Sequence, residues 1–394
     1  IMSDSRYGGS MTDQGRDYTL AIDGVTIIEG TNFHPLKLDT QASIDGFATI
    51  YYELNDETRI EMTNKISNGK LGAMLDMRGR NLDGEGNFID GTITDFRNNL
   101  DTFAQTMIVN TNNIYALAAQ DSMHSQDLKD MDESMTLQNY SSYVKDGSFK
   151  VNIYNATGDV VATKEIKIDA STTMNDTRQG NSIVAQFNSD TDDNGNNNLN
   201  DDLDDYFEAI YTYDEKTGMG HLGFLPKQAE GEYTISIEDN GTNFAGVFGM
   251  SQFFEGNKAA NMQVEQSLRA DSSKIKGNKA PIDGDNAMAN EMIQLQTKQV
   301  DFINKEGSIK NESITGYYRY LTSDIASRTE SVIALNSTNQ SLYASVYSEH
   351  QSISGVNMDE ELSNLIRFQS SYGAAAKIIT TVDQMLNSLL SIKQ

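Results

Sequence analysis

The chain has 394 residues, a formal net charge of -27 and no cysteine. Its length suffices for about two to four domains. The acidic balance argues against nucleic acid or an anionic membrane surface as the main partner, because both require basic patches. Without cysteine the chain forms neither disulfides nor thiolate metal sites. We expect no membrane-spanning helix and no secretory signal peptide, because neither type of apolar segment is present in the sequence.

The first part of the chain combines predicted strands with one predicted helix. Residues 18–30 and 48–54 alternate in hydropathy and are predicted as strands, and residues 65–88 as a glycine-punctuated link. Over residues 92–119 apolar residues recur at steps of four and three, which indicates a helix. Its stripe consists of Phe96, Leu100, Phe103, Met107, Asn110, Ile114 and Leu117.

The middle of the chain is predicted to be rich in strands. Residues 148–169 favour a strand, a turn at 156–159 and a second strand, and residues 231–239 alternate as another strand. Residues 244–256 form an apolar segment that contains glycine. We interpret residues 138–258 as a β-rich outer domain inserted between helical parts.

The helical pattern returns after this block. Met288, Met292, Leu295 and Phe302 predict one helix. A longer helix is predicted from Leu321, Ile325, Val332, Leu335, Asn339, Leu342 and Val346.

Asn110 and Asn339 each interrupt an apolar helix stripe. One interpretation is a solvated or locally bonded side chain at the edge of the core. The other is a side chain that fixes helix register, which a buried asparagine does at a cost in stability.

The end of the chain predicts one long helix with a narrow apolar stripe. Gly355 and Asn357 break the preceding segment, and residues 359–361 place three acidic side chains in the first turn, where they are favourable. An isolated helix with such a stripe is marginal in water, so we expect partner helices to cover it in a coiled coil. The C-terminal stripe comprises Leu365, Phe368, Tyr372, Ala375, Ile379, Val382, Leu386 and Leu389.

These patterns predict an α+β multidomain protein. We expect long helices with coiled-coil-like seams, which form a discontinuous helical domain, and an inserted β-rich domain. The predicted parts are residues 1–137 and 259–349 for the helical core domain, 138–258 for the outer domain and 350–394 for the C-terminal helix.

Four segments resemble a known family. The string SGVNMDEELSNLIRFQSSYGAAAKIITTVDQML resembles the C-terminal signature of bacterial flagellar axial proteins, which are the rod, hook and hook-associated proteins. The segments KISNGKLGAMLDMRGRNLDG, FAGVFGMSQFFEG and GDNAMANEMIQLQ resemble segments of the hook-associated members. The C-terminal signature alone does not choose among the members of the family.

The resemblance implies a structural protein of the flagellum, not an enzyme, that joins hook to filament. The implied partners are further copies in a ring, hook protein, a second junction protein (hook-associated protein 3), an export chaperone and the flagellar export apparatus. The implied location is extracellular, at the hook–filament junction. Family members also carry an N-terminal helix that pairs with the C-terminal one. None is visible here, so we expect an N-terminally truncated chain.

The acidic stretch 189–206 resembles an EF-hand calcium loop but not a whole EF-hand. Side-chain oxygens at alternate positions can surround a calcium ion, and Gly195 permits the sharp turn. Asn197 and Asp201 depart from the apolar residue and the glutamate that are usual at their positions. A solvated acidic turn is the alternative, and residues 202–211 are predicted as helical. The predicted ligands are Asp190, Asp192, Asn194, Asn196, Asn198 and Asp201.

The sequence gives little support for a catalytic site. Residues 218–223 fit the spacing G-x-G-x-x-G, but Pro226 follows closely, so a turn between strands is predicted instead of a dinucleotide site. The histidines stand far apart, which disfavours zinc. The alternatives to the junction protein are a calcium-dependent surface binding protein or adhesin, and another flagellar axial protein such as hook protein.

Overall fold

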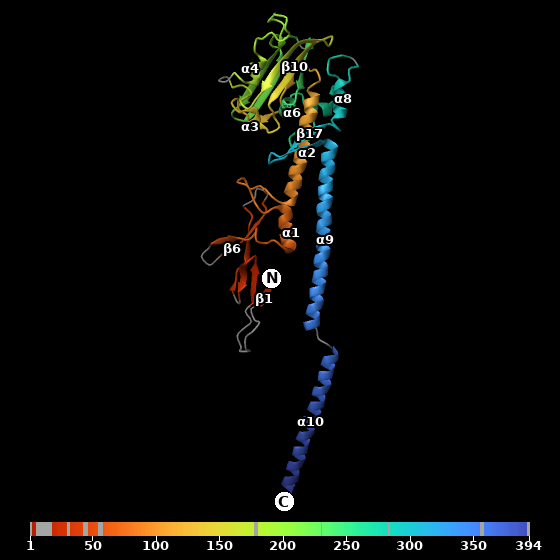
Figure 1. The fold of residues 1–394 in the computed structure, drawn as a ribbon. Helices are drawn as coiled ribbons and strands as arrows, with labels where there is room; N and C mark the ends of the chain where they lie inside the picture. Colours follow the sequence, from red (N-terminus) through yellow and green to blue (C-terminus); the bar gives the residue numbers. More distant parts are fainter. Residues whose placement is uncertain are drawn as a thin grey trace. The chain divides into compact units, whose positions relative to one another are not determined.

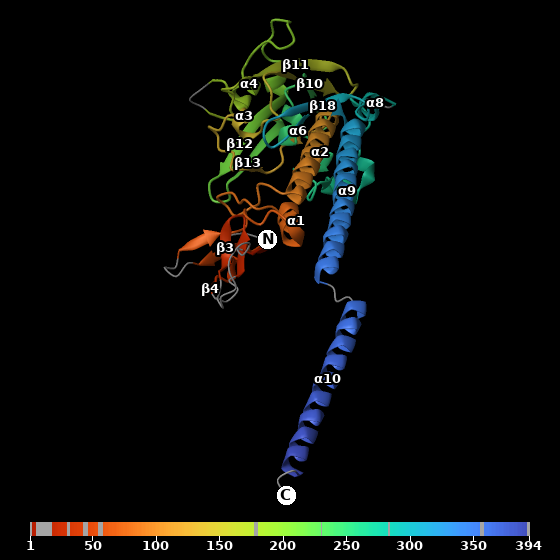
Figure 2. The ribbon, with the colours of Figure 1, turned by 60° about the horizontal axis from the view of Figure 1, so that its bottom comes forward.

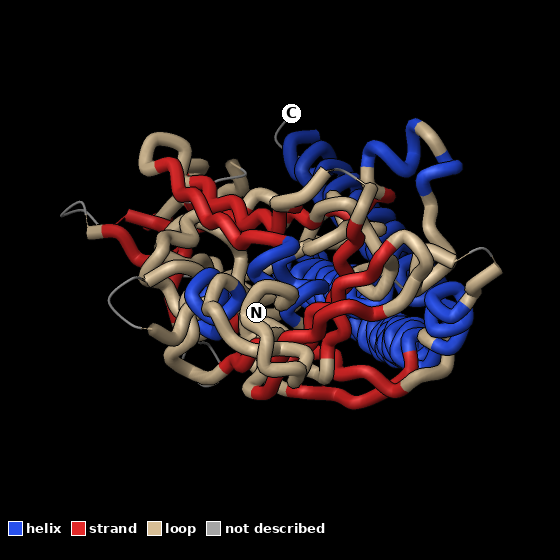
Figure 3. The backbone as a smooth tube through the Cα atoms, turned by 90° about the horizontal axis from the view of Figure 1, so that it is seen from above, coloured by secondary structure: helices blue, strands red, loops and turns tan. Residues whose placement is uncertain are grey.

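The computed structural model describes residues 2–4, 18–29, 32–41, 46–53, 58–176, 180–229, 231–282, 284–354 and 358–391. The chain divides into two compact units, Ile1–Leu321 (unit 1) and Thr322–Gln394 (unit 2). Unit 1 is mixed α+β, with several small antiparallel sheets, and unit 2 is helical (Figure 1). Figure 3 shows the short groups of strands separated by loops and helices. The three predicted boundaries between the four parts of the chain stay predictions.

The N-terminal part of unit 1 contains two small sheets and the first helix. The predicted strand at 18–30 is a hairpin, which turns at Asp23 and Gly24, where φ is 47° and 76°. The segment predicted as a link contains helix α1 (Gly69–Arg78), so its glycines did not prevent a helix. The strands are β1 (Met2–Asp4), β2 (Tyr18–Ile22), β3 (Val25–Glu29), β4 (Asn32–Phe33), β5 (Leu36–Asp39), β6 (Thr49–Glu53) and β7 (Arg59–Glu61).

The β-rich block of unit 1 contains two sheets, ordered β11-β10-β14 and β12-β13-β8, with β9 also paired to β13 (Figure 2). The hairpin predicted at 148–169 is confirmed as β10 and β11. Its helices are α3 (Leu137–Tyr140), α4 (Ile183–Phe187), α5 (Leu203–Tyr206) and α6 (Phe244–Phe248). Its strands are β8 (Met123–His124), β9 (Leu128–Lys129), β10 (Gly147–Asn155), β11 (Val160–Ile168), β12 (Phe207–Asp214), β13 (Met219–Pro226) and β14 (Tyr233–Asp239).

Of two local predictions for the β-rich block, one is wrong in part and the other is confirmed. The helix predicted over 202–211 is wrong beyond Tyr206, because residues from Phe207 onward form β12, which pairs with β13. The turn predicted at 218–223 in place of a dinucleotide site is confirmed at Gly218, which ends the turn of this same hairpin, and the rest of the motif lies in β13. Gly218 adopts a φ of 68° and Met219 begins β13, so a strand follows where a dinucleotide loop requires a helix.

After the β-rich block the chain returns through short elements. The helix predicted from Met288 to Phe302 is wrong in its second half, because Phe302 lies in β17 and stacks on Tyr317 with ring centroids 3.9 Å apart. The elements are β15 (Phe254–Glu255), β16 (Gln263–Val264), α7 (Gln266–Ala270), the 3-10 helix Ser272–Lys274, α8 (Ala287–Gln294), β17 (Gln299–Ile303) and β18 (Ile309–Ser313).

Two long helices complete the chain. Helix α9 (Ile314–Ser354) begins in unit 1, and α10 (Met358–Ser391) lies wholly in unit 2. Both were predicted from their apolar spacing. The predicted break at Gly355 and Asn357 lies outside the described residues.

Helix α2 (Thr92–Tyr115) supplies side chains to both large cores of unit 1. Val109 belongs to the core shared with the β-rich block. Ile114 and Tyr115 belong to the second core, together with Tyr317 and Leu321 from the first turns of α9. Because α2 is buried on two sides, segments that are distant from one another in the sequence pack against the same helix.

Hydrogen bonds and a close backbone contact fix α6 and the following residues on α2. The amide oxygen of Asn112 accepts the N–H groups of Phe253 and Phe254, each at 2.9 Å, and its NH₂ group donates to the Phe254 carbonyl. The Gly246 N–H donates to Asn113 Oδ1 at 2.6 Å. A Cβ atom at Gly246 would lie 2.0 Å from the Val109 carbonyl oxygen, so only glycine fits this contact.

We expect Gly246→Ala to lower the free energy of unfolding by about 1–3 kcal/mol, because the methyl group forces α6 away from α2. Gly180→Ala is the matched control, since its Cβ meets nothing within 4 Å. Denaturant unfolding followed by circular dichroism checks both. Equal stability of the two variants contradicts the close α2–α6 contact.

Candidate assembly surface

Helix α10 begins with acidic side chains and has an exposed surface throughout. Asp359, Glu360 and Glu361 occupy its first turn, next to the partial positive charge of the helix N-terminus. None of its described residues is buried. Every residue of the C-terminal stripe is exposed, from Val382 at 49% to Tyr372 at 79%. The structure therefore presents the stripe as an uncovered apolar surface.

The sequence pattern missed several exposed apolar residues beside this stripe, of which Ile378 and Met385 widen it on one side. Ile378 and Met385 are 65% and 61% exposed and lie one position before stripe residues Ile379 and Leu386. At about 100° of rotation per residue, each side chain extends the apolar surface to the same flank of the helix. A template with a strict alternation of three and four residues excludes such flanking positions. A search for the wider stripe that is usual in globular helices finds them.

Several hydroxyl groups of α10 form hydrogen bonds within the helix. Ser371 Oγ donates to the Arg367 carbonyl and Thr381 Oγ1 to the Lys377 carbonyl, each at 2.8 Å. Such bonds to the preceding turn leave these hydroxyls without need of an outside partner. The apolar stripe is thus the feature of α10 whose stabilisation requires another molecule or segment.

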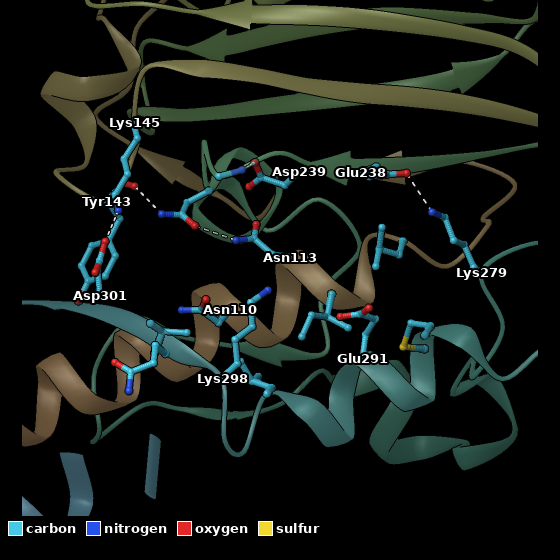
Figure 4. Close-up of a pocket in the computed structure, with 18 of the residues that line it drawn as sticks. Asn110, Asn113, Tyr143, Lys145, Glu238, Asp239, Lys279, Glu291, Lys298 and Asp301 are labelled. Carbon is cyan, nitrogen blue, oxygen red and sulfur yellow. Dashed lines mark hydrogen bonds and ion pairs between the residues drawn. The ribbon is translucent and has the colours of Figure 1, made fainter. Parts of the chain in front are cut away.

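Unit 1 also contains a polar cleft of about 520 Å³ (Figure 4). Helix α2, the end of β14, α8 and β17 line it. Two ion pairs lie at its walls, Lys145 with Asp301 and Lys279 with Glu238, the second at 2.9 Å. These two ion pairs join the β-rich block to the returning segment.

Burial raises the pKa of two further side chains that line the cleft, Tyr143 and Asp239. The Tyr143 hydroxyl donates to the Ile303 carbonyl at 3.2 Å and lies 2.9 Å from Thr106 Oγ1, and burial raises its pKa. Asp239 Oδ1 accepts the N–H groups of Gly241 and Thr242. Its buried Oδ2 has no hydrogen-bond partner in the described part of the chain, and burial raises the pKa of this carboxyl.

The predicted seam asparagines occupy different settings. Asn110 is half-buried and donates to the Thr106 carbonyl of its own helix at 2.8 Å, which matches the interpretation of a locally bonded side chain. Asn339 is exposed on α9.

The acidic loop is closed by its own hydrogen bonds. Asp192 accepts the backbone N–H groups of Gly195, Asn196 and Asn197, and Asn196 Nδ2 donates to Asp201 Oδ2 at 2.7 Å. The sharp turn predicted at Gly195 is confirmed by a φ of 75°. Asp190, Asn194 and Asn198 lie in the same loop, where Asn194 donates to the Asp201 carbonyl.

Metal ligands were predicted in this loop. Over the residues that the structure describes, no three histidine, aspartate or glutamate side chains gather as a metal-binding group. The predicted site also uses amide oxygens, and calcium binding stays a prediction.

Comparison with known proteins places this geometry in a biological context. Residues 8–128 match the family model of the flagellar hook-associated protein FlgK helical domain. Residues 348–392, which include α10, match the model of the flagellar basal body rod FlgEFG protein C-terminal region. Two regions of this chain therefore match models of flagellar axial proteins, which confirms the resemblance to flagellar hook-associated proteins made from the sequence and supports a structural role in the flagellum.

The chain is also similar to curated flagellar hook-associated proteins. The chain is 32% identical to flagellar hook-associated protein 1 of Salmonella typhimurium (strain LT2) over 111 residues, which is 28% of this chain and 19% of that protein. It is 28% identical to flagellar hook-associated protein 1 of Bacillus subtilis (strain 168) over 107 residues, 27% of this chain and 20% of that protein. These matches span about a fifth of the relatives' length. Among the described helices, none has the length and hydropathy to cross a membrane.

We expect Asp239→Asn to be more stable than the unchanged chain at neutral pH, because it removes a carboxylate that burial disfavours. A raised folded-state pKa means that the proton-linked stabilisation is present at low pH and lost as pH rises through that pKa. The advantage of the variant therefore shrinks as pH falls. Thermal unfolding from neutral to acidic pH measures it.

Asp301→Asn is the control, because its effect on stability should depend on pH in the opposite direction. The side-chain amide of Asn311 and the Lys145 ammonium lower the pKa of Asp301, so this carboxylate stabilises the fold above its unfolded-state pKa. The variant should lose stability at neutral pH, and the loss should fade on acidification. The same pH dependence for both variants contradicts this description of the cleft.

The calcium prediction is tested by isothermal titration of the intact chain and of Asp190→Ala plus Asp192→Ala. Heat in the intact chain that the double variant lacks supports the site. No heat from the intact chain removes it.

Proposed function

We propose that the chain is a structural protein of the bacterial flagellum that joins hook to filament by polymerising as a junction ring. The exposed C-terminal stripe carries this proposal. Its proposed partners are neighbouring copies, hook protein and hook-associated protein 3, with an export chaperone and the flagellar export apparatus before assembly. Its proposed location is the extracellular hook–filament junction.

The energetics of the stripe favour association. Full burial of one leucine, isoleucine or phenylalanine side chain contributes about 1.5–3 kcal/mol. Several such side chains on one helix supply enough free energy to offset the entropy that subunits lose on assembly. The acidic first turn stays compatible with this packing, because the charges lie at the end of the helix.

The width of the stripe supports more than one neighbour. A narrow coiled-coil seam covers one partner helix. Ile378 and Met385 extend the apolar surface to one side, where a second neighbouring helix can pack. Repeated contacts of this kind around an axis produce a closed ring or tube.

The helical segments before and after the β-rich block form one discontinuous domain in this proposal. The packing of Tyr317 and Leu321 into a core with Ile114 and Tyr115 supports it. The β-rich block is then a separate outward part, joined through α2 and the cleft. The match to the FlgK helical domain favours a hook-associated protein over hook protein.

We expect Ile379→Asp plus Leu386→Asp to abolish filament attachment and swimming when the gene is replaced in cells. Burial of an unpaired carboxylate at a helix interface costs several kcal/mol, so the ring should not close. Light microscopy of motility, electron microscopy of hooks and measurement of flagellin in the medium check the outcome.

Gln384→Asp plus Ser388→Asp is the matched control, because it adds the same charge to α10 on the side away from the stripe. These cells should swim. Hooks that carry normal filaments in the stripe variant would remove the physical basis of the proposal, provided that circular dichroism shows the purified variant to be folded.

A further inference from the structure

Two edges of the β-rich block end in strands with one neighbour each. Strand β11 pairs with β10, and β12 pairs with β13, within the described sheets. The outer side of such a strand presents N–H and C=O groups that can bond a strand of another chain. Both edges therefore create a risk of strand pairing between copies.

Two side-chain amides occupy one position on each of these edges. The Lys167 N–H donates to Gln186 Oε1 at 2.8 Å, and Gln186 Nε2 donates to the Lys167 carbonyl at 2.9 Å. The Ala209 N–H donates to Asn188 Oδ1 and Asn188 Nδ2 donates to the Ala209 carbonyl, both at 2.8 Å. Each amide thus makes the same pair of bonds that a residue of an adjacent antiparallel strand makes.

The segment that carries the two amides is firmly held. Ile183 and Phe187 of α4 are fully buried, and Phe187 stacks on Phe224 with ring centroids 4.3 Å apart. Ser182 Oγ accepts the Ala185 N–H at the start of the helix. Anchored in this way, α4 directs Gln186 towards β11 and the following Asn188 towards β12.

The residues after Asn188 also protect the β11 edge from pairing with a strand of another chain. The ammonium group of Lys164 on β11 lies 3.2 Å from the Asp193 carboxylate, and both side chains are 7% exposed. This buried pair ties the acidic loop to the β11 edge. Asp190 and Asp192 are exposed in the loop, and charge beside a sheet edge disfavours strand addition.

We propose that Gln186 and Asn188 keep the β11 and β12 edges from pairing with strands of a second copy. A second copy is the relevant partner because it carries the same edges, and two identical edges pair antiparallel about a twofold axis. The inference concerns unit 1 and goes beyond the proposed assembly through α10. It explains why the chain can associate through one surface without joining through its sheets.

The test is the full chain with Gln186→Met plus Asn188→Leu, which keeps side-chain size and removes both donors and acceptors. The variant is made together with Ile379→Asp and Leu386→Asp, so that the C-terminal stripe does not contribute. Hydrogen exchange reports the backbone N–H groups of Lys167 and Ala209, and sedimentation velocity reports the mass over a range of concentrations.

We expect faster exchange of the two N–H groups and a roughly twofold rise in mean mass with concentration, as two-fold edge pairing requires. The control is Gln266→Met plus Asn68→Leu in the same background, which adds the same apolar groups at exposed positions outside the β-rich block. The control chain should stay monomeric. An edge variant that exchanges faster but stays monomeric like the control overturns the proposal.

If the double variant does not fold by circular dichroism, Gln186→Met alone decides the question, because it opens one edge at the exposed Lys167 position. Association of this single variant above the control supports the proposal. A monomeric, folded single variant with fast exchange at Lys167 overturns it.

Discussion

Both large cores of unit 1 depend on apolar contacts along helix α2. Val109 faces the core of the β-rich block, and Ile114 and Tyr115 face the core that includes β17 and the first turns of α9. The Asn112 amide bonds the backbone of Phe253 and Phe254, although these residues lie more than a hundred positions away. Loss of the helix would therefore remove side chains from both cores at once.

Helix α10 has a similar sequence pattern and the opposite environment. Both helices show apolar residues at steps of three and four, yet α2 is covered by its own chain and α10 is exposed along its described length. A stripe in a sequence predicts that burial is needed, but it does not identify the partner. The flagellar match that includes α10 supports the proposal that neighbouring subunits supply that burial.

Local pattern predicted the long helices and the β10–β11 hairpin, because their residues repeat regularly over many positions. It failed where distant pairing decided the structure. Phe302 continues a helical spacing but lies in a strand, since β17 pairs with β18 and its ring stacks on Tyr317. Residues 207–211 likewise form a strand because β13 pairs with them.

The candidate sites show the same limit. The seven alternating steps of three and four residues were enough to find the C-terminal stripe, whereas Ile378 and Met385 lie outside that narrow template. The roles of Gln186 and Asn188 have no local signal, because their partners Lys167 and Ala209 are brought near only by the folded sheets. The turn at Gly195 was predictable from glycine's access to positive φ.

The central claim is that neighbouring copies bury the C-terminal stripe. Because the chain has no cysteine, single spin labels can be placed at Ala375→Cys on the stripe and at Gln384→Cys away from it. Electron paramagnetic resonance then compares the purified chain with the assembled junction. The account predicts that the label at Ala375→Cys is mobile in the free chain and immobilised on assembly, while the label at Gln384→Cys stays mobile. Equal mobility of the stripe label in both states would contradict it.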